Sequence, residues 1–381
     1  MKVIIIGNYP PDKQESMKLF STMLNKGLIN KGIDAEIWVP SVFFGYFSKS
    51  TIKGLGKWLG YLDKWVLFPI ILRIRLLKNR YRNGEIRFHI CDHSNSPYLA
   101  HLPLLKSAIT CHDVLAIRGA FGFEDAYCTP SKFGLILQKW ILKNLLKADK
   151  IATVSELTLN QLKDLSIGIN AANKNWQVIH NAFNGDFGVL PKYESTEKMR
   201  AMGFSDEVPF LLHVGSSLER KNRKLLVDML IELGDKWNGI VCFAGEEIDP
   251  DLASYINSRD LHNRVKSIQR PTHQDLLALY CSCEAFVFPS FSEGFGWPLI
   301  EAQACGVPVI ASNIAPMPEV SGGAALHASP YHAKDFADAF LSLKDLSLRD
   351  RLISNGFENC KRFSLIRMTE AYISLFNLNR N

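Results

Sequence analysis

The chain lacks the patterns that mark membrane-spanning, secreted and disulfide-rich proteins. None of the apolar runs in its 381 residues reaches the roughly 20 residues that a membrane-spanning helix needs. The apolar run at the start of the sequence is too short for a signal peptide and predicts a first β-strand. The eight cysteines form no CxxC pair and no regular framework. We therefore expect reduced core cysteines in a cytoplasmic protein, without a disulfide framework or a bound metal.

A dinucleotide-binding fingerprint is also absent. Apolar runs at 2–7 and 35–40, with an amphipathic segment at 17–31 between them, predict a strand, a helix and a parallel strand. A doubly wound α/β domain begins in this way. No GxGxxG follows the first strand, which argues against an ordinary nicotinamide dehydrogenase. The length of the chain predicts two or three domains, each with enough residues for a core.

Acidic residues are scarce in one segment, which concentrates the charge of the chain there. Residues 49–87 hold ten lysines and arginines against Asp63 and Glu85, so they carry +8 while the whole chain carries +6. The rest of the chain is slightly acidic, so we expect a local anionic partner and no nucleic acid.

Aromatic and aliphatic residues fill 43–82 between these cations, and Pro69 is expected to kink or divide this helical region. Two interpretations stay open. In the first, the segment is a basic-aromatic surface for an anionic membrane, at the inner face of the plasma membrane. Alternatively, its helices bury their apolar face on the sheet and leave the basic face in water.

The most informative stretch is FPSFSEGFGWPLIE at 288–301. It places two carboxylates, Glu293 and Glu301, on either side of a glycine turn and a helix start. Pro298 suits the first turn of a helix because its missing N–H would have no intrahelical partner there. A helix N-terminus presents unpaired N–H groups and partial positive charge, which favour phosphate. Glycines beside it allow a ligand to approach the backbone.

The string SEGFGWPLIEA, followed by ACGVPVIAS, resembles the signature of retaining glycosyltransferases of family 4. The resemblance implies the GT-B fold, an α/β architecture of two Rossmann-like parallel-sheet domains with an interdomain cleft. We expect an acceptor-binding domain at 1–185, a linker at 186–208 and a nucleotide-sugar-binding domain at 209–361. We expect the last helix, within 362–381, to pack back on the first domain.

Polar residues end the predicted strands of the first domain, where ligands sit in open parallel sheets. His93 follows one strand, and His112 follows another in ITCHDV, which resembles the strand-end His-Asp of the family. By that resemblance His112 approaches the donor sugar. The loop after the first strand is often glycine-rich in the family, but here it reads NYPPDKQES. Its weaker candidates for acceptor or phosphate contacts are Asn8, Gln14 and Ser16.

The second domain offers a cationic loop in GSSLERKN, which resembles the Gly…Arg-Lys-Asn stretch of the family. Arg220 and Lys221 can bind a diphosphate, the first through its planar fork and the second as a point charge. As solvated cations they would be unfavourable there, because the helix dipole repels positive charge at a helix start. The resemblance adds a set of expected donor contacts: Ser217, Ile268, Phe295, Gly296, Trp297, Leu299, Ile300 and Glu301.

These residues imply transfer of a hexose from a nucleotide diphosphate sugar to a glycan or lipid-linked acceptor in polysaccharide synthesis. By resemblance, Glu301 accepts from ribose hydroxyls, and Glu293 lies near the sugar, where a carboxylate can stabilise a cationic ring. Arg220, Lys221 and the helix N-terminus can stabilise the leaving diphosphate without a metal, so we expect no cofactor. UDP-glucose or another UDP-hexose is the first expectation for the donor, with a GDP-sugar next. The alternatives are a sugar-nucleotide epimerase on the same fold and a catalytically silent nucleotide-sugar-binding subunit.

Overall fold

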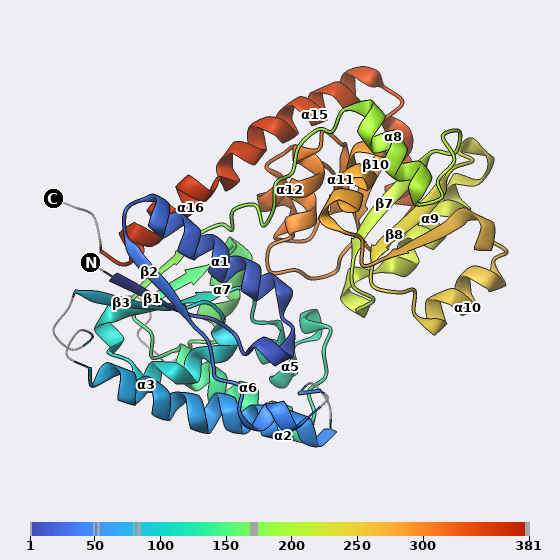
Figure 1. Ribbon diagram of the computed structural model, residues 1–381. Coiled ribbons are helices and arrows are strands. Elements are labelled where there is room, and N and C mark those ends of the chain that lie inside the picture. The colour runs from blue at the N-terminus through green and yellow to red at the C-terminus, as the bar shows by residue number, and fades with distance from the viewer. Residues whose placement is uncertain are drawn as a thin grey trace. The chain divides into compact units, whose positions relative to one another are not determined.

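The apolar runs of the chain form the strands of two six-stranded, all-parallel sheets, each in its own unit (Figure 1). The structure, a computed structural model, describes residues 2–48, 50–51, 54–78, 81, 85–167 and 174–377. One unit comprises Met1–Asn184 with Leu365–Asn381, and the other comprises Gly185–Ser364. Two parallel sheets with helices match the α/β architecture that the sequence predicts.

The sheet of the first unit has the strand order β2-β1-β3-β4-β5-β6. Its strands are β1 Lys2–Ile6, β2 Asp34–Trp38, β3 Ile86–Ile90, β4 Ser107–Cys111, β5 Lys150–Thr153 and β6 Asn175–Val178. Its longer helices are α1 Glu15–Asn30, α2 Gly54–Leu62, the π-helical turn η3 Asp63–Leu67, α3 Phe68–Leu76, α5 Leu115–Ala120, α6 Lys132–Leu145, α7 Glu156–Asp164 and α16 Leu365–Leu375. Its short 3-10 turns are η1 Pro10–Asp12, η2 Phe44–Phe47, η4 His93–His101, η5 Leu104–Lys106 and η6 Glu124–Ala126.

Alternation along β1 divides the core of the first unit into two layers. Val3 and Ile5 point to the face covered by α1 and α16, whereas Ile4 and Ile6 point to the face covered by α3, η4 and α6. The last helix therefore belongs to this unit (Figure 1). Its Tyr372 is fully buried, and the hydroxyl lies 2.8 Å from Oγ1 of Thr110 on β4.

The helical region around Pro69 is divided, as the sequence predicts. It runs as α2, the π-helical turn η3 and α3, with Pro69 in the first turn of α3. A π-helical turn shifts the hydrogen-bond ladder by one residue, and here the N–H of Phe68 donates to the carbonyl of Asp63. The missing N–H of Pro69 thus falls where the ladder is already rearranged.

The second sheet has the order β12-β11-β10-β7-β8-β9. Its strands are β7 Phe210–Gly215, β8 Ile240–Gly245, β9 Val265–Gln269, β10 Ala285–Phe288, β11 Val309–Ser312 and β12 Leu326–Ala328. Its helices are α8 Lys192–Ala201, α9 Arg223–Leu233, α10 Pro250–Ser258, α11 His273–Ser282, α12 Trp297–Ala304, α13 Met317–Ser321, α14 Ala333–Ser342 and α15 Leu346–Cys360. Its short 3-10 turns are η8 Glu219–Lys221, η9 Gly234–Lys236, η10 His262–Arg264 and η11 Lys361–Phe363.

The expected linker at 186–208 is wrong, because this segment is structured and belongs to the second unit. Helix α8 packs against α11, and Phe204 contacts Phe210 at the start of β7 with 4.9 Å between ring centroids. The sequence did not predict α8 as a helix because most of its residues are charged or polar. Ser195 and Met199 are its buried residues, too few to give an apolar stripe that a sequence pattern would reveal.

Candidate functional site

The loops that follow β7, β8 and β10 form the candidate site of the second unit. These strands are parallel neighbours, so their carboxyl ends meet at one edge of the sheet. Gly215 ends β7 and pairs in register with Gly245 at the end of β8. Gly245 has φ of 127°, and a Cβ there would lie 2.5 Å from the carbonyl oxygen of Gly215. Glycine is therefore required where these two strand ends approach.

Glu293 is held between the two predicted phosphate ligands. Its Oε1 accepts from Lys221 Nζ at 2.6 Å, and its Oε2 accepts from Arg220 Nη1 at 2.8 Å. Arg220 Nη1 also donates to the carbonyl of Ser292 at 2.9 Å. Glu293 and Lys221 are buried, with 7% and 9% of their surface exposed. The structure thus brings together three of the four predicted catalytic residues in one ion-pair cluster.

The electrostatics of this cluster keep Glu293 ionised. Burial alone raises the pKa of Glu293, but the charges of Lys221 and Arg220 outweigh it, and the net pKa is lowered. Burial lowers the pKa of Lys221, while Glu293 and Glu301 raise it in part. Two cations therefore share one carboxylate, which leaves positive charge in a buried position beside the strand ends.

The Arg-Lys-Asn stretch is fixed to the loop after β10 by hydrogen bonds of its own. Asn222 has φ of 53° and is the N-cap residue of α9. Its Nδ2 donates to the carbonyls of Pro289 at 3.1 Å and Pro330 at 2.7 Å. The N–H of Phe291 donates to the carbonyl of Arg220 at 2.8 Å. Asn222 thus holds the cationic loop against the loop that carries Glu293, a role that the sequence did not reveal.

Two further residues were missed in the sequence and shape the same edge of the sheet. Glu246 accepts from both the N–H and the hydroxyl of Ser217, at 2.9 and 3.0 Å. Arg223 is buried and donates to the carbonyls of Gly215, Glu246 and Glu247 at 2.8 to 2.9 Å. Ser217, a predicted donor contact, is therefore positioned by a carboxylate from the next strand end.

The predicted helix start is observed at α12. Gly296 is the N-cap with φ of 100°, a left-handed conformation that favours glycine, and Pro298 lies in the first turn. The side chains of Leu299 and Ile300 are fully buried. Their side chains are therefore closed off from a ligand. Phe295 is also buried, with its ring against Trp297 and Phe363.

Glu301 lies on α12 with 4% of its surface exposed, and its Oε2 accepts from the hydroxyl of Tyr280 at 2.9 Å. Burial and the charge of Glu301 raise the pKa of Tyr280, which therefore stays protonated as the donor. Ile268 is half-buried near the end of the edge strand β9. Its position on the strand and its burial do not test the predicted donor contact, which stays a prediction.

The strand ends of the first unit hold a second polar cluster around Asp92. Asn8 Nδ2 donates to Asp92 Oδ2 at 2.6 Å and also contacts Gln14, and Asn95 Nδ2 donates to Asn8 Oδ1 at 3.1 Å. His93 Nδ1 lies 3.4 Å from Asp92 Oδ1. The structure thus joins three candidates, Asn8, Gln14 and His93, through a carboxylate that the sequence analysis did not weigh.

His112 and Ser16 have different surroundings. The Nε2 of His112 lies 2.9 Å from the carbonyl oxygen of Cys91, and the ring packs edge-on against Phe20 with centroids 4.6 Å apart. Burial lowers the pKa of His112, although Asp92 opposes this, so the ring is neutral at pH 7. Ser16 is exposed on the first turn of α1.

Comparison with known families decides what kind of domain carries the cluster around Glu293. Residues 194–359, which lie within the second unit and span most of it, match the family described as glycosyl transferases group 1. The second unit is therefore similar to known glycosyltransferases over most of its length. The prediction that the chain is a glycosyltransferase is thereby confirmed, whereas its narrower assignment to family 4 stays a prediction.

Curated relatives of this glycosyltransferase align over different shares of the chain. It is 42% identical over 106 residues to O-antigen chain mannosyltransferase B of Escherichia coli, 28% of each chain. It is 26% identical over 315 residues to O-antigen chain mannosyltransferase RfbU of Salmonella typhimurium, 82% of this chain and 77% of the relative. It is 28% identical over 196 residues to N,N'-diacetylbacillosaminyl-diphospho-undecaprenol alpha-1,3-N-acetylgalactosaminyltransferase of Campylobacter jejuni, 49% and 50% of the two chains.

Solved structures match the glycosyltransferase along its whole length. Sucrose-phosphate synthase from Thermosynechococcus elongatus superimposes with a TM-score of 0.74 at 18% identity, covering 100% of both chains. Anabaena Alr3699/HepE in complex with UDP and glucose gives 0.72 at 15% identity, covering 99% of both. At these identities the likeness concerns the fold, and the predicted GT-B architecture is confirmed.

Proposed function

We propose that this glycosyltransferase moves a hexose, with retention of the anomeric configuration, from a nucleotide diphosphate sugar to a glycan or lipid-linked acceptor in polysaccharide synthesis. The observation that carries the proposal is the buried Glu293 between Lys221 and Arg220 at the strand ends of the group 1 domain. A carboxylate and two cations within hydrogen-bond distance supply the charges that breaking a sugar–phosphate bond requires.

The residues of the cluster would take different roles when the donor binds. Both cations bond Glu293, so an incoming diphosphate would take over part of their charge. Lys221 and Arg220 would then stabilise the leaving diphosphate, with the N-terminus of α12 adding partial positive charge. Glu293 would face the sugar and stabilise positive charge on the ring in the transition state. Glu301, oriented by Tyr280, would accept from the ribose hydroxyls. This assignment needs no metal, and among the described residues no cluster of three or more His, Cys, Asp or Glu could hold one.

Mannose is the sugar that we propose, because the first two relatives above are named as mannosyltransferases. A nucleotide diphosphate mannose such as GDP-mannose is then the donor. A UDP-hexose, the first expectation from the sequence, is the second candidate, supported by the Alr3699/HepE complex with UDP and glucose.

A thermal-shift titration with GDP, UDP, ADP, GDP-mannose and UDP-glucose tests the donor. A ligand that binds only the native state raises the melting temperature by mass action. At a free ligand concentration of 100 times the Kd, the free energy of unfolding increases by roughly 2.7 kcal/mol. We expect GDP and GDP-mannose to give the largest shift. A shift with UDP and UDP-glucose alone would refute mannose transfer from a GDP-sugar, and no shift with any of them would contradict nucleotide-sugar binding by this domain.

We also propose that the first unit docks on an anionic membrane surface through α2, η3 and α3. Their sequence left open which face is buried, and the contacts now favour the membrane interpretation. A Cβ at Gly56 would lie 2.0 Å from the carbonyl oxygen of Ser50, so the small face of α2 packs on the domain. The carboxylate of Asp63 is fully buried and accepts from three backbone N–H groups of 43–45 and from the Tyr9 hydroxyl.

Large apolar side chains point the other way. Seven of them recur every three or four residues along this helical region, and all are at least 41% exposed: Leu55, Trp58, Leu62, Val66, Ile70, Ile74 and Leu77. We call these residues the apolar stripe. The exposed Phe133, Ile136 and Trp140 of α6 adjoin it, since Trp58 contacts Phe133 with 4.8 Å between centroids. Exposed apolar surface of this extent marks an interaction site.

Charge favours an anionic membrane as the partner. Between 54 and 78 the only acidic residue is the buried Asp63, against Lys57, Arg73, Arg75, Lys78 and Lys64, of which Lys64 is paired with Asp12 at 2.6 Å. Lys49, Lys53, Arg80 and Arg82 of the same basic-aromatic segment lie outside the described residues. Each cation near an anionic surface contributes about 1 kcal/mol. No helix among the described residues is long and apolar enough to cross a bilayer, so the proposed docking is peripheral.

Replacing Val66 and Ile70 together with glutamine is expected to weaken binding to phosphatidylglycerol vesicles at low salt by at least about tenfold. Both side chains are more than half exposed, and each would lose apolar burial worth about 1 kcal/mol in the membrane. Sedimentation with vesicles measures the effect, and Leu346→Gln, an exposed leucine of the second unit, is the control. A wild-type protein that stays in the supernatant would contradict the proposal.

A further inference from the structure

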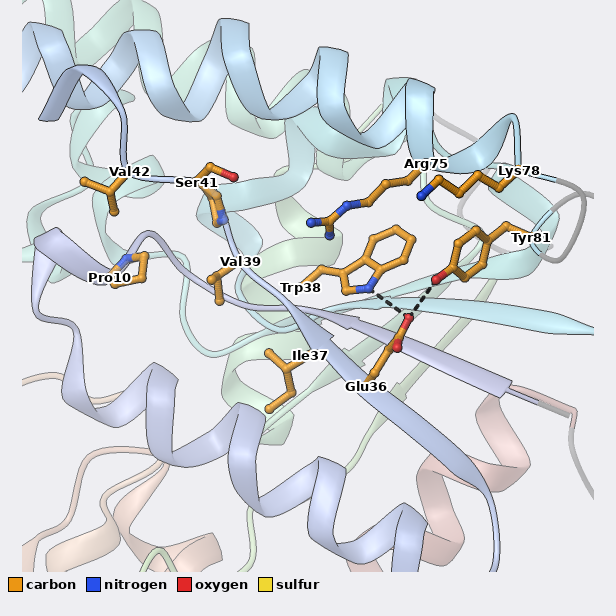
Figure 2. A pocket seen from close by; sticks show the side chains of 11 residues that line it. Pro10, Glu36, Ile37, Trp38, Val39, Ser41, Val42, Arg75, Lys78 and Tyr81 are labelled. Atoms are coloured by element: carbon orange, nitrogen blue, oxygen red, sulfur yellow. Dashed lines mark hydrogen bonds between the residues drawn. The ribbon is translucent and has the colours of Figure 1, made fainter. Parts of the chain in front are cut away.

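A hollow of about 590 Å³ lies beside the edge strand β2, between its end and helix α3 (Figure 2). Trp38 and Ser41 line it from the β2 side, and Arg75 and Lys78 line it from α3 and the residues that follow. Its position differs from both polar clusters described above, and its two cations belong to the basic segment 49–87, which the proposed reaction does not use.

The two cations of this hollow have no acidic partner. Among the residues that the structure describes, neither Arg75 nor Lys78 forms a salt bridge or a side-chain hydrogen bond. The guanidinium of Arg75 lies over the ring of Trp38, 4.8 Å from its centroid, and this stacking fixes its position. Figure 2 shows both side chains reaching over Trp38 toward the hollow. Arg75, held in this way, presents an N–H fork, and Lys78 adds an ammonium to the same space.

The carboxylate of Glu36, which also lines the hollow, has hydrogen-bond and ion-pair partners of its own. Its Oε1 accepts from Trp38 Nε1 at 2.9 Å and from the Tyr81 hydroxyl at 3.2 Å, and its Oε2 pairs with Lys2 at 3.1 Å. Burial raises the pKa of Glu36, but the hydrogen bond and charge of Lys2 outweigh it, and the net pKa is lowered. Glu36 therefore orients the aromatic walls. It shares Lys2 with Asp34, whose Oδ2 lies 3.3 Å from Lys2 Nζ, but the two positive charges of Arg75 and Lys78 still exceed the one negative charge of Glu36 beside the hollow.

The hollow adjoins the apolar stripe. Ile74 and Leu77 of the stripe are direct sequence neighbours of Arg75 and Lys78, and they are 56% and 75% exposed. On a helix, neighbouring positions point about 100° apart, so Arg75 flanks the stripe at Ile74 of α3, and Lys78 follows just after the helix ends. If the stripe rests at the acyl-chain boundary, the hollow lies at the depth of the lipid phosphates.

We propose that this hollow binds the phosphate group of an anionic lipid. Arg75 would grip two phosphate oxygens through its fork, Lys78 would add a point charge, and the hydroxyl of Ser41 is the further donor that lines the hollow. The proposal rests on the membrane docking proposed above and deepens it, because it turns a diffuse electrostatic attraction into a site for one lipid molecule.

Calorimetric titration with dihexanoyl phosphatidic acid, kept below its micellar concentration, tests the site. We expect saturable 1:1 binding to the wild-type protein and at least tenfold weaker binding to the double variant Arg75→Gln, Lys78→Gln. The control is Lys132→Gln, Lys143→Gln, which removes the same charge from exposed positions of α6 and should bind as the wild type does. Equal weakening in both variants, or no saturable binding to the wild type, would overturn the proposal.

Two further arms separate the sources of failure. Inorganic phosphate titrated in place of the lipid should bind at least tenfold more weakly, and equal affinity would show a free-phosphate site instead. The nucleotide-induced thermal shift, a property of the second unit, is recorded for the same variants. Loss of lipid binding with that shift retained is expected for the double variant. Absence of the shift in the wild type would count against the proposed transferase, whereas absence of lipid binding would count against the hollow.

Discussion

Replacing Glu293 with glutamine is expected to lower kcat by about 100- to 1,000-fold while affinity for the nucleoside diphosphate is kept or increases. The loss of rate follows because a charge aimed at the developing positive charge of the sugar is removed. The gain in affinity follows because Lys221 and Arg220, which Glu293 occupies at 2.6 and 2.8 Å, become available to the diphosphate. Steady-state kinetics and calorimetry measure the two quantities separately.

The same substitution leaves two cations without their buried carboxylate, which destabilises a protein by several kcal/mol. We therefore expect a lower melting temperature and a larger upward shift on adding nucleoside diphosphate than in the wild type. Glu219→Gln is the matched control, since Glu219 is exposed on the same loop as Lys221. An unchanged kcat, or a loss of affinity as large as the loss of rate, would contradict the role assigned to Glu293.

Replacing Lys221 with methionine is expected to weaken binding of the nucleoside diphosphate by roughly 10- to 100-fold, which matches 1.5–3 kcal/mol for a hydrogen bond to a charged group. Methionine keeps the volume and apolar character of the stem, so the buried site stays filled. The rate should fall as well, because the same ammonium stabilises the leaving diphosphate. Affinity for the nucleoside, which has no phosphate, should not change.

Lys224→Met is the control for this experiment. Lys224 lies three residues further along, in the first turn of α9, is half exposed and pairs with Asp228 at 2.8 Å. It should bind both ligands as the wild type does. If Lys221→Met retained its affinity for the diphosphate, or lost nucleoside affinity to the same extent, Lys221 would not be a phosphate ligand.

The sequence predicted the sheet architecture and the position of the candidate site because both depend on local patterns. Apolar runs give buried parallel strands, and polar residues at strand ends mark the edge where ligands bind. The predicted helix start at Gly296 and the predicted division at Pro69 follow from the backbone restrictions of single residues.

What the sequence could not predict are contacts between distant residues. Glu293 and Lys221 were assigned separate roles, and only the fold brings these residues, 72 positions apart, into one ion pair. Asp63 counted as one acidic residue among basic ones, although it is buried and organises the backbone of 43–45. Helix α8 was taken for a linker because it has few buried residues.

The outward face of α2 could not be assigned either, because the apolar residues on both sides of this helix looked equivalent in sequence. The contacts of Gly56 and the burial of Asp63 identify the inner face and leave the stripe outside. The spacing of apolar residues in the sequence predicts that a segment is amphipathic, whereas tertiary contacts decide which face is covered.

The most direct test of the account is transfer of a labelled sugar. The wild-type protein is incubated with ¹³C-labelled GDP-mannose or UDP-glucose, a lipid extract as the source of acceptors, and EDTA. We predict labelled glycolipid and nucleoside diphosphate in equal amounts, an anomeric configuration in the product equal to that of the donor, and the same rate without EDTA. A donor that binds but releases no nucleoside diphosphate would contradict the account and make the protein a silent nucleotide-sugar-binding subunit.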